Sequence, residues 1–83
     1  METKTLVGIR NTSFKSQSGD EIEGKTLAFE YPIPEDKGEG FDVERIFVSN
    51  AKLNNLSSVL DINSSVQLVY NKYGKVDDIV DVK

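Results

Sequence analysis

Alternating apolar and polar residues predict β-strands over most of the chain. The clearest alternation lies in residues 22–33, where every second position is large and apolar: Leu27, Phe29, Tyr31 and Ile33. This period of two is typical of a strand with one buried face. The apolar residues of segment 5–14 predict an earlier strand, in which Gly8 indicates a bulge or bend. Small polar residues at positions 16–20 predict the turn between the two strands.

Residues 41–48 predict a third strand with an irregularity. Phe41 and Val43 fall on one face, whereas Ile46 and Val48 fall on the other. A single inserted residue produces such a change of phase, so we expect a β-bulge at positions 44–45.

A short helix is expected after this strand. Asn50 can cap it, and three leucines spaced as one helical stripe follow: Leu53, Leu56 and Leu60. A helix of about ten residues is marginal in isolation, so this stripe must pack against the sheet.

The last third of the chain predicts a β-hairpin. Two β-rich runs, residues 66–70 and 76–82, flank a turn that contains Gly74. We expect a three-residue loop with Gly74 in the left-handed conformation. Three aspartates interrupt the second run, which is typical of an exposed edge strand.

Residues 32–40 hold two prolines, three acidic residues and two glycines. This composition predicts a long, mobile, acidic loop rather than a linker between domains.

The predicted order is three strands, one helix and two strands. This is the order of the OB-fold, so we expect an all-β protein whose residues 1–83 form a single domain. The expected architecture is a five-stranded OB-like barrel with one short helix between strands three and four. A small SH3-like barrel and an α+β sandwich with one covering helix are alternatives.

Composition excludes several kinds of chemistry. The chain has no Cys and no His, which excludes disulfides, thiolate metal sites and Ser-His-Asp or Cys-His catalysis. The acidic residues lack EF-hand spacing, and the glycines form no phosphate-binding loop. We therefore expect no enzymatic activity, no cofactor and no metal. Without a membrane-length apolar run or a signal peptide, a cytoplasmic location is expected.

Three short segments carry a resemblance to a known family. Residues 14–20 form a Gly-containing turn, and a strand with Glu23-Gly24-Lys25 follows it. This layout resembles the small single-stranded DNA-binding, helix-destabilising proteins of phages and mobile elements. Residues 70–76 likewise resemble small proteins of Gram-positive phages and conjugative elements. The resemblance implies an OB-like fold that binds single-stranded DNA or RNA.

Single-strand binders combine cations for the backbone with aromatic rings on which bases stack. An OB-fold presents both on strands two and three and on the loops after strands one and four. The candidate nucleic-acid-binding residues are Arg10, Lys15, Lys25, Arg45, Lys72, Tyr73 and Lys75. Tyr73 is the most prominent, because it lies at a hairpin tip between two lysines. Four other aromatic residues are expected in the core: Phe14, Phe29, Tyr31 and Phe47.

The formal net charge of −4 opposes binding of a polyanion. A second function therefore stays open, a non-enzymatic protein-interaction or accessory module on an OB-like scaffold. The acidic loop favours a protein partner, whereas the cationic hairpin tip favours nucleic acid. An unpaired edge strand would also allow a two-fold dimer.

Overall fold

The computed structural model describes residues 3–57 and 59–82. Five antiparallel strands form one sheet in the order β3-β2-β1-β4-β5. The elements are β1 (Thr3–Lys15), β2 (Glu21–Pro32), β3 (Phe41–Ser49), α1 (Asn50–Leu53), β4 (Ser65–Tyr70) and β5 (Val76–Asp81). The mostly β fold and the short helix between the third and fourth strands are thus confirmed.

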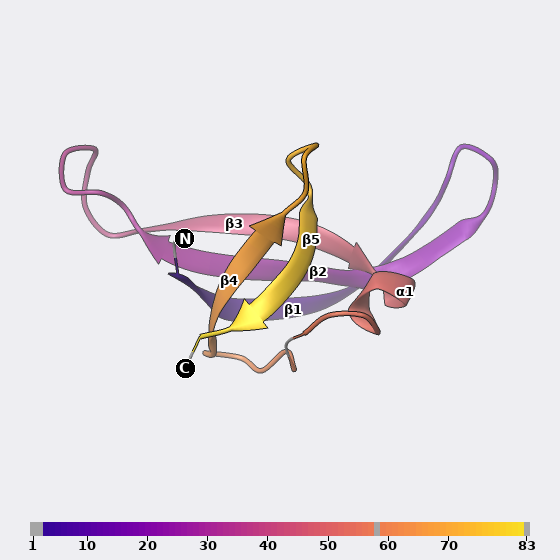
Figure 1. Cartoon of the computed structure of the whole chain (residues 1–83). Helices are drawn as coiled ribbons and strands as arrows, with labels where there is room; N and C mark the ends of the chain where they lie inside the picture. Colours follow the sequence, from indigo (N-terminus) through magenta and orange to yellow (C-terminus); the bar gives the residue numbers. More distant parts are fainter. Residues whose placement is uncertain (1–2, 58, 83) are drawn as a thin grey trace.

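The sheet folds over on itself. Most of β1 pairs with β2, but its first residues, Thr3 to Thr5, pair with β4. The β4–β5 hairpin therefore crosses in front of the three-stranded part of the sheet (Figure 1). The core lies between these two parts and comprises Leu6, Leu27, Phe29, Val48, Val66, Leu68 and Ile79. Among the described residues β3 and β5 are the two ends of the sheet and do not pair, so the sheet is not closed.

Strands β1 and β2 follow the sequence pattern. Their register shifts between Leu6 and Gly8, which confirms the predicted irregularity of β1. On β2, Leu27 and Phe29 are fully buried, whereas Thr26 and Ala28 lie on the opposite side. We call these two sides the core face and the outer face of the β1–β2–β3 sheet.

The predicted bulge of β3 is wrong. The register between β2 and β3 is continuous from Gly24 opposite Ser49 to Pro32 opposite Phe41. The change of phase has a different cause: Glu44 occupies a core-face position, where it forms an ion pair with Lys4. Phe41 and Val43 are exposed on the outer face.

The helix is shorter than predicted. It comprises one turn, and its N-cap is Ser49, whose hydroxyl accepts a hydrogen bond from the Lys52 N–H, rather than Asn50. The predicted leucine stripe nevertheless packs against the core, although its second and third members follow the helix.

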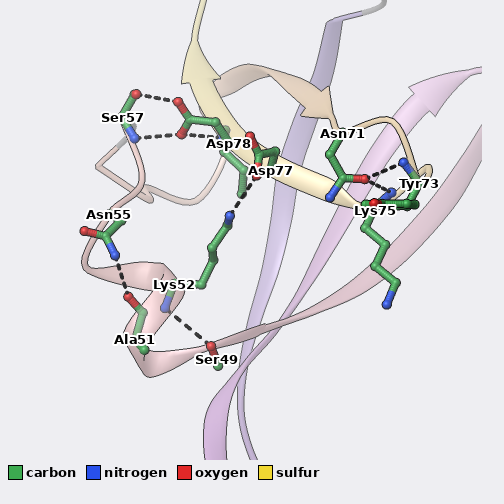
Figure 2. Close-up of polar contacts among 11 residues, drawn as sticks. Ser49, Ala51, Lys52, Asn55, Ser57, Asn71, Tyr73, Lys75, Asp77 and Asp78 are labelled. Atoms are coloured by element: carbon green, nitrogen blue, oxygen red, sulfur yellow. Dashed lines mark hydrogen bonds and ion pairs between the residues drawn. The ribbon is translucent and has the colours of Figure 1, made fainter.

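Helix α1 and the segment that follows it both contact β5. Lys52 forms an ion pair with Asp77, and both the N–H and the hydroxyl of Ser57 donate hydrogen bonds to the Asp78 carboxylate (Figure 2). The Ser57 hydroxyl and N–H lower the pKa of Asp78, because they stabilise its charged form.

The two remaining connections contain local hydrogen bonds. Ile33 donates to the Gly40 carbonyl across the acidic loop, whose mobility stays a prediction. In the last hairpin, the Asn71 N–H donates to the Lys75 carbonyl, and Gly74 has a φ of 78°. The left-handed Gly74 is thus confirmed. No helix among the described residues is long and apolar enough to cross a membrane.

Candidate nucleic-acid interface

Arg10 and Arg45 approach a common hollow on the outer face. The register places Arg10 beside Thr26 and Arg45 beside Ala28, so the two arginines lie on opposite sides of β2. Gly8 lies opposite Ala28, and these small residues leave a hollow of about 560 Å³. Both arginines line this hollow.

The charges of these two arginines are available to a ligand. Within the described parts of the chain neither guanidinium group forms an ion pair or a hydrogen bond, and both residues are exposed. The nearest acidic position on the same face is Glu30, two residues along β2 from Ala28. A phosphate could therefore pair with either arginine without displacing an internal partner.

An exposed aromatic pair lies farther along the same face. The rings of Phe14 and Phe47 meet edge to face, with centroids 5.2 Å apart and planes at 68°. These side chains are 47% and 38% exposed, so their predicted place in the core is wrong. The prediction holds for Phe29, which is fully buried, while Tyr31 is half-buried.

Gly24 brings the Phe47 ring close to the sheet. A Cβ atom at position 24 would lie 2.8 Å from Phe47 Cζ and would collide with the Val48 carbonyl oxygen. Strand alternation does signal the exposure of Phe47, because it shares a face with Arg45 rather than with Ile46.

The hairpin tip, residues 71–75, forms a second cationic and aromatic feature. The Asn71 side-chain oxygen accepts hydrogen bonds from the N–H groups of Tyr73 and Lys75, which fixes the loop (Figure 2). Tyr73 is 75% exposed, and the Lys72 ammonium group lies 5.1 Å from its ring centroid. This cation–π contact covers one side of the ring and leaves the other accessible.

The structure does not bring Lys15 and Lys25 to the arginines. Both belong to the row of β1–β2 positions that continues the core face, opposite to Arg10. Lys25 donates a hydrogen bond of 2.8 Å to Asn11, and Lys15 lies opposite Glu21. The tip of the β1–β2 hairpin also lies at the end of the sheet, apart from the tip of the β4–β5 hairpin (Figure 1).

A polar cluster on the core face joins four strands, β1, β2, β3 and β4. Lys4 Nζ lies 2.8 Å from Glu44 Oε2 and 4.7 Å from the Tyr31 ring centroid, and the Tyr70 hydroxyl donates to Glu44 Oε1 at 3.1 Å. Burial opposes the charge of Lys4, but the hydrogen bond and charge of Glu44 outweigh it and raise the pKa of Lys4. Burial also raises the pKa of Tyr70, with a further contribution from the charge of Glu44.

Comparison with known proteins gives no match: no family model, no curated protein and no solved structure matches this chain. The case for a function therefore depends on the sequence and the geometry described above.

Proposed function

We propose that this protein binds single-stranded nucleic acid along the outer face of β1, β2 and β3. The observation that carries the proposal is the pair of arginines, Arg10 and Arg45, whose guanidinium groups have no partner among the described residues, beside the exposed Phe14–Phe47 pair. Arginines pair with phosphates, and aromatic rings stack with unpaired bases whatever their sequence. Lys72, Tyr73 and Lys75, at the tip of the β4–β5 hairpin, provide a second cationic and aromatic contact beyond the β3 edge of the sheet.

The proposed architecture is a partly open OB-like barrel. The strand order, the crossing β4–β5 hairpin and the helix after β3 support this relation, because OB barrels are small, five-stranded and partly open. The resemblance of residues 14–25 and 70–76 to proteins of phages and mobile elements supports an origin of that kind and a cytoplasmic site of action.

The acidic charge of the chain limits the affinity rather than excluding binding. Three of the fourteen acidic residues are at positions 35, 36 and 39, in the loop at the opposite end of the sheet from the β1–β2 hairpin (Figure 1). Screening over about 8 Å at physiological salt weakens the repulsion from such distant charges. We expect micromolar affinity and a marked dependence on salt.

The test is a fluorescence anisotropy titration with a labelled 15-nucleotide oligothymidine at several salt concentrations, repeated with the matching RNA. Arg10→Gln and Arg45→Gln should each weaken binding and lower the salt slope by about 0.7, the value for one lost phosphate contact. Lys37→Gln is the matched control, since it removes the same charge from the acidic loop. Equal effects of all three substitutions would contradict a localised site.

A protein-interaction module is the second candidate. The observation that favours it is the free edge of β3 together with the exposed Phe41 and Val43 side chains. An unpaired edge strand can accept a strand from a partner. If the wild-type protein binds neither DNA nor RNA at low salt, this function replaces the first.

A further inference from the structure

A second hollow lies where the sheet stays open, between β3 and the β4–β5 hairpin. Its volume is about 540 Å³, and it lies among Ile46, Phe47, Tyr70, Lys75 and Val76. We call it the seam hollow. It is comparable in size to ligand pockets of about 300–1,000 Å³.

Polar contacts join the β4–β5 hairpin to α1 and to β3 at the two ends of the seam hollow. At one end, the Lys52–Asp77 ion pair joins α1 to β5 (Figure 2). At the other end, the Tyr70 hydroxyl donates to Glu44 and so joins β4 to β3. These contacts keep the hairpin at a fixed place beside β3, although no β3–β5 pairing exists among the described residues.

The chemistry of the seam hollow suits a flat, partly polar ring. Ile46, Phe47 and Val76 provide apolar walls, while the Tyr70 hydroxyl and the Glu44 carboxylate provide hydrogen-bonding groups at one end. Lys75 also lines the hollow, and its ammonium group forms no ion pair or hydrogen bond within the described chain. A nucleobase matches the walls and the polar end, and its phosphate matches the charge of Lys75.

Phe47 connects the seam hollow to the outer face. Phe47 is among the residues that line the seam hollow, and its ring packs against Phe14 on the outer face, so this residue of the β3 edge belongs to both surfaces. A strand that passes over the Phe14–Phe47 pair therefore reaches the free edge of β3 directly beside Lys75. We infer that one unstacked base of the bound strand turns over this edge and inserts into the seam hollow, with its phosphate on Lys75. This inference rests on the proposed function.

The test is a substitution that places a larger side chain inside the seam hollow. Val76→Phe adds a ring on the side of β5 that lines the hollow, whereas Val80→Phe makes the same change on the opposite side of that strand, where Val80 is 37% exposed. Binding of the labelled oligothymidine should weaken about five- to hundredfold in Val76→Phe, the effect of one lost stacked base. Binding by Val80→Phe should stay within about twofold of wild type.

A measurement on the wild-type protein tests the same inference without requiring the Val76→Phe variant to fold. Methyl resonances of Ile46 and Val76 should shift when oligothymidine saturates the protein, and should stay in place with an oligomer of abasic nucleotides. If arginine substitutions weaken binding but Val76→Phe binds normally and these methyl groups do not shift, the insertion is wrong and the outer-face site stands. If the wild-type protein binds no oligonucleotide, both proposals are wrong.

Discussion

The Lys4 ammonium group lies 2.8 Å from the Glu44 carboxylate and joins the beginning of β1 to the middle of β3. The Lys4 side chain is 9% exposed, so its charge depends on this partner. We expect Glu44→Gln to lower the free energy of unfolding by about 1–3 kcal/mol, because it leaves a buried ammonium group without a counter-charge. Urea denaturation measures this loss. The double variant Lys4→Met/Glu44→Leu should recover most of it, and an equally unstable double variant would contradict the electrostatic explanation.

The polar cluster of Lys4, Glu44 and Tyr70 predicts a loss of stability at alkaline pH. The folded state raises the pKa values of both Lys4 and Tyr70 above their ordinary values of 10.5 and 10.0. The folded protein therefore binds these protons more tightly than the unfolded chain does, and this stabilisation is complete below about pH 10. It should disappear as the pH rises through the raised values. Urea midpoints between pH 8 and pH 11.5 should fall, and Glu44→Gln should show a shallower decline.

Strand alternation predicts much of this fold because most strands pair with the strand that precedes or follows them in the chain. On β2 a period of two identifies Leu27 and Phe29 as buried, and Gly8 indicates the irregularity of β1. The pattern fails at Glu44, where a charged residue faces the core. That position is explained by Lys4 and Tyr70, partners that are distant in the sequence, so apolar periodicity alone suggests a bulge that is absent.

The sequence alone predicts only part of the candidate site. Arg10 and Arg45 can be chosen from their charge, but their approach across β2 depends on strand register. Phe14 and Phe47 are missed because large aromatic residues are usually buried, and their exposure depends on the strand register that places both on the outer face. The unclosed edge of the sheet depends on the position of the whole β4–β5 hairpin.

Gly24→Ala should destabilise the protein by about 1–3 kcal/mol, since the added methyl group overlaps β3 backbone atoms that cannot move aside independently. Gly8→Ala is the control, because its Cβ would lie 3.4 Å from the Ala28 Cβ and Gly8 has no positive φ. Thermal unfolding compares the two variants. A Gly24→Ala variant as stable as wild type would show that β3 lies farther from β2 at this point.

Tyr73→Ala should weaken oligothymidine binding about five- to hundredfold, because an exposed ring that stacks on a base contributes about 1–3 kcal/mol. Little change in the urea midpoint is expected, since the side chain is 75% exposed and its visible partner is Lys72. Tyr73→Phe separates stacking from hydrogen bonding by the hydroxyl, and it should bind like wild type. If Tyr73→Ala also binds like wild type, the Tyr73 ring contacts Lys72 but does not stack on a base. Base stacking is then confined to the Phe14–Phe47 side of the sheet.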